Sequence, residues 1–385
     1  EILRAAVVQS YNLSFTKADK KSNQLFSLGY YDQQGLVKFS DFKRVSGRFN
    51  SEYKLFDDHF RIGENISLSH SWGTSVSNNA ALGGTLYEAY KFQSITPVKN
   101  LEDEYAGNVF SDIPNPMGKL YRNKDNQDKK SRLVGNLYAE LHLFDGLMFK
   151  TSFGVDYNNL YRRSFSPKYD ELNASEKLSS LSNRNAWNFN WVFTNTLTYN
   201  KTFGDHTINA LLGMESLRNR YEYFTASRDG FPSDDPNFRF LDAGDVGTQK
   251  NSGAATEYSM VSYFGKLDYN YHDRYLVAFT LRRDGSSRLG NNKWGNFPAM
   301  SVGWNVSNEH FMEGVAFLST LKVRAGFGIT GSLPNEAYSS LSRLASGNNF
   351  LTNGSSWIPT LQPESNANPD LKWEKKEEWN LGFDY

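Results

Sequence analysis

The chain has 385 residues, with 42 Lys plus Arg balanced by 42 Asp plus Glu, an aromatic content of 15%, and no cysteine. The balanced charge offers no basic field for a nucleic acid, so no nucleic-acid partner is expected. The missing cysteine excludes disulfides and thiolate metal sites. No run of about 18 apolar residues occurs, so the sequence contains no candidate transmembrane helix.

Alternation of apolar and polar residues with a period of two recurs along the chain and predicts about thirteen strands. The clearest run sets Trp187, Phe189 and Trp191 on one face against Asn188 and Asn190 on the other. In chain order, the alternating cores cover residues 11–15, 26–30, 45–53, 60–68, 133–141, 147–155, 187–199, 208–214, 261–271, 275–281, 300–306, 321–329 and 379–385.

The connections between these strands also alternate. Those after odd-numbered strands are short, apart from one that suggests a short helix near 309–317. Those after even-numbered strands are longer, above all 73–130, 221–255 and 332–370. Short turns on one side and long loops on the other are typical of an outer-membrane β-barrel, so we expect the long loops to face the outside of the cell.

Aromatic residues gather beside the short turns, where an interfacial girdle of a membrane barrel belongs. Ordinary packing at the ends of a sheet is the alternative explanation for this set: Tyr53, Phe56, Phe60, Tyr199, Phe203, Tyr269, Tyr271 and Tyr275. Glu64 does not fit, because it falls on the face that should meet lipid. A bulge that shifts the alternation is the expectation at this point.

The polar rows on the opposite face supply the candidate site residues. In a wide barrel this face lines a wet lumen, where such residues tune what passes. They could equally hydrogen-bond one another or a plug. The candidates for the lumen wall are Arg44, Arg48, Glu52, Asn188, Asn190, Lys266, Asp268, Arg282, Lys322 and Arg324. Four loop aromatics could stack on a substrate or pack beneath a partner, or pack loop on loop: Tyr221, Tyr223, Phe224 and Trp357.

No motif supports catalysis or a cofactor. Gly326–Gly331 matches G-x-G-x-x-G, but it lies inside strand alternation, whereas a nucleotide site needs a strand followed by a helix. The six histidines are not spaced as metal ligands, and no nucleophile–His–acid set is visible. Neither a cofactor nor a metal is therefore expected, and no enzyme activity.

Several stretches resemble the barrel of the SusC/RagA family of TonB-dependent outer-membrane transporters. They are specific in composition and occur in consistent order over most of the chain: Tyr31–Gly35, Ser40–Arg44, Arg282–Arg288, Trp294–Trp304, Leu321–Gly331, Asn368–Lys375 and Glu378–Gly382.

This resemblance implies a 22-stranded barrel with an N-terminal plug, coupled to the TonB complex and paired with a SusD-like surface lipoprotein. The cargo would be a glycan oligosaccharide or a peptide, and the location the outer membrane, in contact with its lipid. No plug or TonB box is visible, and a thirteen-stranded barrel would leave open edges in lipid. We therefore expect residues 1–385 to form part of a barrel domain whose plug and remaining strands lie elsewhere in a longer chain.

Two other functions stay open from the residues. A passive porin would have the same barrel without a plug or an energy source. A secreted β-rich adhesin would use the strands structurally, with its short-turn aromatics in water rather than in lipid.

Overall fold

A computed structural model describes residues 2–76, 84–315, 318–334, 336–354 and 356–385. Thirteen strands form one antiparallel sheet, in which neighbours in sequence are neighbours in space. They are β1 (Val8–Ala18), β2 (Ser22–Gln34), β3 (Asp41–Leu55), β4 (Phe60–Gly73), β5 (Gln127–Phe144), β6 (Leu147–Ser166), β9 (Ser180–Phe203), β10 (His206–Asp229), β11 (Lys250–Tyr271), β12 (Tyr275–Ser286), β13 (Trp294–Asn305), β14 (Lys322–Ser332) and β17 (Glu374–Asp384). The predicted all-β fold and its strand cores are confirmed.

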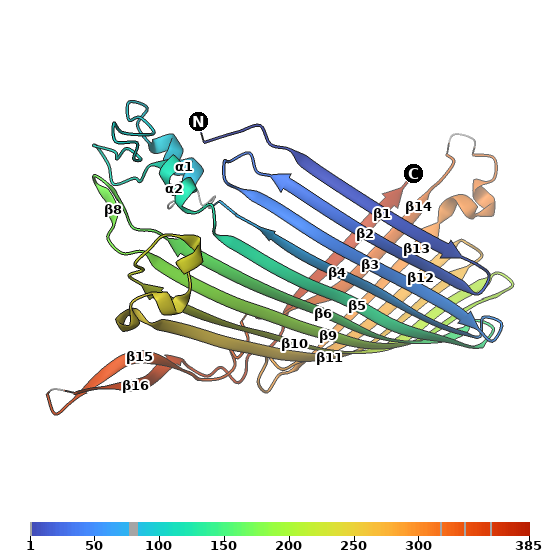
Figure 1. Cartoon of the computed structure of the whole chain (residues 1–385). Helices are drawn as coiled ribbons and strands as arrows, with labels where there is room; N and C mark the ends of the chain where they lie inside the picture. Colours follow the sequence, from blue (N-terminus) through green and yellow to red (C-terminus); the bar gives the residue numbers. More distant parts are fainter. Residues whose placement is uncertain (1, 77–83, 316–317, 335, 355) are drawn as a thin grey trace.

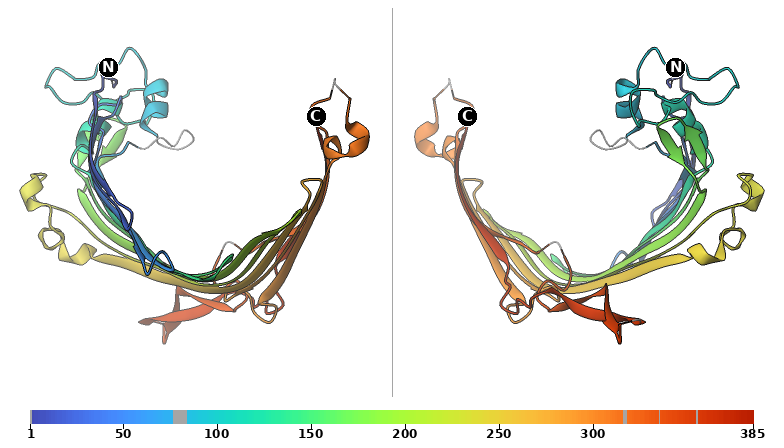
Figure 2. Two further views of the ribbon diagram at one scale, coloured as in Figure 1. Left: turned by 90° about the vertical axis from the view of Figure 1, so that its right-hand side faces the viewer. Right: turned by 90° about the vertical axis from the view of Figure 1, so that its left-hand side faces the viewer.

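The sheet curves into an open trough, with β1 along one rim and β17 along the other (Figure 2). Neither edge strand is paired on its outer side within the described chain. Figure 1 shows that the short turns gather at one end of the trough and most long connections at the other; we call these the short-turn end and the long-loop end. At the short-turn end, glycines with positive φ close two hairpins, Gly146 (φ 89°) and Gly204 (φ 56°).

The apolar side chains of the sheet point outward, onto the convex face. Phe15, Leu68, Leu212 and Leu267 are each between 46 and 65% exposed, and their strand neighbours follow the same phase. A soluble sheet would bury this face against a second layer, so its exposure indicates contact with lipid. No helix among the described residues is long and apolar enough to cross a membrane.

The prediction of the long loops is wrong in its boundaries. β10 and β11 extend to Asp229 and from Lys250, which leaves only 230–249 as a connection, with the 3₁₀ turns η1 (Pro236–Phe238), η2 (Leu241–Ala243) and η3 (Val246–Thr248). The segment after β4 contains two short helices, α1 (Thr85–Lys91) and α2 (Pro116–Arg122), and residues 77–83 lie outside the described part.

Two further connections carry structure of their own. A small hairpin, β7 (Tyr169–Glu171) and β8 (Ala174–Glu176), follows β6. The connection between β14 and β17 forms the hairpin of β15 (Arg343–Thr352) and β16 (Ser356–Ser365), which extends beyond the convex side of the trough (Figure 2). Residues 335 and 355 of this predicted loop lie outside the described part.

The helix expected near 309–317 is also wrong. The structure has two 3₁₀ turns there, η4 (Val306–Asn308) and η5 (His310–Met312), while 316–317 lie outside the described residues. Gly314 follows with φ 96°, a conformation that ends a helix. The G-x-G-x-x-G motif lies within β14, as its alternation predicts.

No bulge rescues Glu64. The registers of β4 with β3 and with β5 run without a shift, pairing Glu64 with Ser51 and with Leu137. The expectation of a bulge is therefore wrong, and Glu64 remains on the convex face. It accepts a hydrogen bond from the Ser51 hydroxyl, whose residue is only 4% exposed.

Small apolar cores lie at the long-loop end rather than inside the trough. One consists of Phe165, Leu181 and Phe231. The other joins Leu289, Phe297 and Trp373, with the rings of Phe297 and Trp373 at 5.2 Å in a T-shaped contact. This second core brings together three stretches that are far apart in the sequence: 282–289, 294–298 and 368–373.

Candidate functional site

All ten residues predicted for the lumen wall lie on the concave face, opposite the outward apolar side chains. The phase follows from the strand registers of the thirteen-stranded sheet, which shift only between His142 and Phe144 beside the β5–β6 turn. For example, Asn188 faces Tyr221 across the β9–β10 ladder, and Lys266 faces Thr280 across β11–β12. The structure thus places them along one polar wall that runs from β3 to β14.

Much of this wall is satisfied by its own hydrogen bonds and ion pairs. The Tyr138 hydroxyl donates to Glu52 at 2.9 Å across β4, above Gly63, where an added Cβ would lie 2.5 Å from the Tyr138 ring. Asn219 donates to the Asn188 side chain at 2.9 Å. These contacts lock the wall side chains against one another, which stiffens the concave surface.

Arg282 is the most connected of the predicted residues. Its guanidinium donates to Asp284 at 2.8 Å, to the Ser262 hydroxyl at 2.9 Å and to Glu215 at 3.3 Å. The same group lies 5.4 Å from the centre of the Phe264 ring. A cation so fully engaged holds β10, β11 and β12 together more readily than it binds a passing solute.

A pocket of about 590 Å³ opens on the concave face of β10 to β17. It brings together four predicted residues, Lys266, Asp268, Lys322 and Arg324. Lys266 pairs with Asp268 at 2.8 Å, and Arg324 with Asp384 at 3.2 Å. Lys322, Arg48 and Arg44 have no ion pair within the described residues, and of these Arg44 lies 5.9 Å from the centre of the Tyr31 ring. Lys322 and Arg48 are therefore the predicted wall cations most available to a plug or a solute.

The four aromatics predicted for loops are not gathered at one place. Tyr221 and Tyr223 belong to the concave face of β10, where Arg184 donates to the Tyr221 hydroxyl at 3.0 Å and lies 4.0 Å above the Tyr223 ring. Phe224 points to the convex face and is 57% exposed, and Trp357 is on β16, 65% exposed.

The long-loop end holds a second pocket, of about 580 Å³, that the sequence did not predict. Three tyrosines contribute to it, and each carries a cation on one ring face: Lys99 at 4.2 Å from Tyr105, Lys124 at 3.7 Å from Tyr121 and Arg122 at 3.8 Å from Tyr169. Burial raises the pKa of Tyr105 and of Tyr169, so both stay neutral phenols at physiological pH.

The local sequence explains how this pocket is positioned. Asn115 caps α2, accepting from the amides of Met117 at 3.1 Å and Gly118 at 3.3 Å, and Pro116 occupies the first turn. The cap thereby directs Arg122 toward Glu171 of β7, with which it forms a buried ion pair. The Asn-Pro pair was a readable signal for this helix, although its tertiary partner was not.

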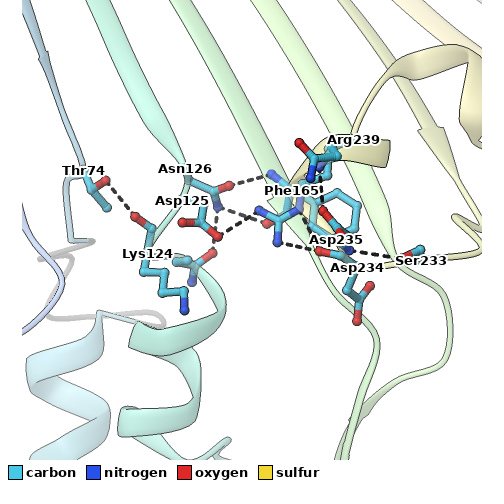
Figure 3. A network of polar contacts seen from close by, with 11 residues as sticks. Thr74, Lys124, Asp125, Asn126, Phe165, Ser233, Asp234, Asp235 and Arg239 are labelled. Carbon is cyan, nitrogen blue, oxygen red and sulfur yellow. Dashed lines mark hydrogen bonds and ion pairs between the residues drawn. The ribbon is translucent and has the colours of Figure 1, made fainter.

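Arg239 joins three of the connections at the long-loop end (Figure 3). It is 8% exposed, donates twice to the Asp234 carbonyl at 2.7 and 3.1 Å, and pairs with Asp125 at 3.2 Å. Its guanidinium lies 4.5 Å from the Phe165 ring, and Asn126 bonds the Phe165 backbone at 2.7 and 3.1 Å. The connections after β4, β6 and β10 therefore form one platform, which we call the loop platform.

No three His, Asp or Glu side chains of the described residues are placed to hold a metal ion. What the geometry offers is a curved wall with lipid on one side, a charged concave surface on the other, and a structured platform at one end.

Comparison with known proteins decides the family. The model of the TonB dependent receptor-like β-barrel matches residues 71–385. The chain belongs to this family. The receptor barrel is 30% identical to TonB-dependent receptor P3 of Formosa agariphila and 28% identical to TonB-dependent receptor SusC of Bacteroides thetaiotaomicron, covering all of this chain but only 38 and 40% of those proteins.

Solved structures agree on the fold. The RagAB peptide transporter superposes with a TM-score of 0.82 at 23% identity, covering 98% of this chain and 42% of that one. The siderophore receptor PiuA of Acinetobacter baumannii superposes with a TM-score of 0.56 at 10% identity. The predicted SusC/RagA resemblance and outer-membrane location are confirmed, so the short-turn end is periplasmic and the long-loop end extracellular.

Proposed function

We propose that the protein containing this receptor barrel imports bulky nutrients, oligosaccharides or peptides, through a gated lumen. One observation carries the proposal: the thirteen strands form an open, curved sheet, and rows of polar side chains line its concave wall from β3 to β14. A barrel that continues beyond thirteen strands has a lumen too wide to be filled by wall side chains, so it holds either an open aqueous channel or a plug, and membership of the TonB-dependent receptor family favours the plug. A plug in turn needs a source of energy to move it, which TonB coupling would supply.

The extracellular loop platform favours a cargo that carries several polar groups. Its pocket carries both signs of charge, with Lys168, Lys124, Asp170 and Asp234 among the lining residues. Oligosaccharides can stack on the free faces of the tyrosines, and peptides can pair with the charges. The fold neighbour RagAB is described as a peptide transporter, which favours peptides.

Uptake in whole cells tests the proposal. Labelled oligopeptides and oligosaccharides are supplied to cells that carry the full-length protein, with and without a functional TonB complex. We expect accumulation of one cargo class that is abolished when TonB is inactive. Uptake that persists without TonB would identify a passive porin. Quenching of the aromatic residues on the convex face by water-soluble quenchers would identify an adhesin.

The β15–β16 hairpin is the strongest candidate for the contact with a SusD-like lipoprotein. A two-stranded hairpin buries little by itself. Phe350 and Ile358 pair on one face and Leu351 and Trp357 on the other, and all four are at least 40% exposed. A hairpin with exposed apolar side chains on both faces is expected to bind the surface of another protein.

Co-purification tests this contact. Trp357→Ala should reduce retention of the lipoprotein on the full-length receptor, because a large exposed aromatic is a typical interface anchor. Phe224→Ala, an exposed aromatic on the barrel wall, is the matched control and should leave retention intact. Equal retention in both variants would remove the hairpin from the interface.

A further inference from the structure

The convex face carries a charged polar row close to its periplasmic edge. Successive registers place Lys17, Gln24, Ser51 and Glu64 in a single outward row across β1 to β4. We call this set the polar row. Apolar side chains surround its Glu64 end: Ile62, Ile66, Phe49, Leu137 and Tyr53.

The depth of Glu64 follows from the strand. Only two outward residues, Phe60 and Ile62, separate it from the β3–β4 turn. With a rise of about 3.3 Å per residue and a strand tilt of about 40°, Glu64 lies roughly 10 Å above that turn. The aromatic girdle of Tyr53 and Phe60 is just below it. Glu64 therefore lies where lipid headgroups of the periplasmic leaflet meet the hydrocarbon.

Within the described chain, the Glu64 carboxylate has too few partners for such a place. The Ser51 hydroxyl gives it one hydrogen bond, whereas a carboxylate accepts about four. The neighbouring Gln24 amide is engaged with the Tyr53 hydroxyl at 2.8 Å. Lys17, the outward cation of the row, is three strands away, a backbone separation of roughly 14 Å.

Pairing at the sheet edges leaves this face uncovered. Strands that complete the barrel would add to β1 and β17, beside the sheet rather than over β3 and β4. The partner of Glu64 therefore comes from the membrane side, and it must donate hydrogen bonds and carry positive charge to offset the cost of a carboxylate at this depth.

We infer that the polar row binds the headgroup of a phospholipid with a primary ammonium, such as phosphatidylethanolamine, in the periplasmic leaflet. The ammonium donates to Glu64, and the phosphate lies toward Lys17 at the headgroup end of the row. The row has a cation, Lys17, at one end for the lipid phosphate and a carboxylate, Glu64, at the other end for the lipid ammonium, so it is complementary to a zwitterionic headgroup. An anionic headgroup would meet Glu64 with like charge, and a quaternary ammonium has no N–H to donate.

Native mass spectrometry of the full-length receptor tests the inference. The protein is supplied with phosphatidylethanolamine, phosphatidylcholine or phosphatidylglycerol, and retained lipid is counted. We expect preferential retention of phosphatidylethanolamine and about a tenfold loss of it in Glu64→Gln. Glu377→Gln, an outward carboxylate at the extracellular end of β17, is the matched control and should behave as wild type.

Two further experiments test the roles of Lys17 and of the lipid ammonium. Lys17→Gln should weaken retention of both zwitterionic lipids without changing the preference between them. If Glu64→Gln does not fold, wild-type protein is compared on lipids with none, one or three methyl groups on the ammonium, and retention should fall with methylation. Equal retention of phosphatidylethanolamine by wild type and Glu64→Gln, or no dependence on methylation, would overturn the inference.

Discussion

At the scale of single residues, the ion pair between Arg122 and Glu171 joins the connections after β4 and β6 within the extracellular loop platform. The two side chains are only 12 and 2% exposed, and Glu171 also accepts from the Asn115 amide at 2.6 Å. Removing one member of a buried pair leaves the other charge without a partner, which typically costs about 3–5 kcal/mol.

Arg122→Ala should therefore loosen the platform. We expect faster cleavage of residues 98–126 and 167–179 by an added protease, while the barrel itself stays folded. Lys177→Ala is the control, because Lys177 pairs with Asp170 at the surface, with side chains 74 and 66% exposed, and should change cleavage little. Equal protection in both variants would contradict the role assigned to Arg122.

Glu309 fastens the periplasmic connection to the girdle, and this contact should depend on pH. Hydrogen bonds from the Tyr275 hydroxyl at 2.7 Å and the Trp304 indole at 3.0 Å lower the pKa of Glu309. A carboxyl whose pKa is lower in the folded state stabilises the fold above its unfolded pKa, about 4.3, and this contribution is lost as the pH falls through the folded pKa.

The matching experiment compares thermal unfolding of the full-length receptor with that of Glu309→Gln. At pH 7 the wild type should have the higher Tm. The difference should shrink as the pH falls below about 4.3 and vanish once Glu309 is protonated in the folded state as well. Glu313→Gln is the control, because the exposed Glu313 carboxyl has His310 as its one ion-pair partner among the described residues. A difference that is constant from pH 7 to pH 3 would show that the Glu309 charge is not involved.

At the scale of elements, the sequence predicts the membrane part of each strand but not the part that continues beyond the membrane. On β10 the outward residues change from Leu212 and Met214 to Arg218 and Arg220, because the strand continues above the membrane and meets water on both faces. Alternation then disappears although the hydrogen-bonded ladder with β9 continues to Asp229. The predicted loop 221–255 was therefore partly strand, over 221–229 and 250–255.

The stretches that resemble the SusC/RagA family, such as Asn368–Lys375, could not be assigned a structural role from the sequence. Trp373 packs against Phe297 and Leu289 and donates its indole N–H to the Lys293 carbonyl at 3.0 Å. These contacts join segments eighty residues apart, which no local pattern encodes. Their role is to anchor the extracellular ends of β12, β13 and β17.

Trp373→Ala should cost about 3–5 kcal/mol of unfolding free energy, as for other large-to-small changes of a buried aromatic. Urea unfolding of the full-length receptor measures it. Trp357→Ala, which removes an exposed tryptophan of the β15–β16 hairpin, should cost far less in the same assay. Comparable losses in the two variants would contradict the assignment of Trp373 to a core.

At the scale of the whole molecule, the fold and the polar face could be predicted because a period of two survives in the membrane part of each strand. The loop platform could not, since Arg239 meets Asp125 across more than a hundred residues. Glu64 shows a third case: its phase was predicted correctly, and the error was to expect the backbone to move it away from lipid.

The central claim is that the convex face meets lipid and the concave face meets water. Nitroxide labels introduced singly along β9 of the full-length receptor in bilayers test it directly. Residues 1–385 contain no native cysteine, and any cysteine elsewhere in the receptor is replaced first. Access to oxygen, which concentrates in lipid, should alternate with access to a water-soluble paramagnet at a period of two. Access to oxygen should be the higher of the two at Phe189, Trp191, Phe193 and Leu197. Access to the water-soluble agent should be the higher at Asn190, Thr194, Thr196 and Thr198. Uniform access along the strand, or the opposite phase, would contradict the account.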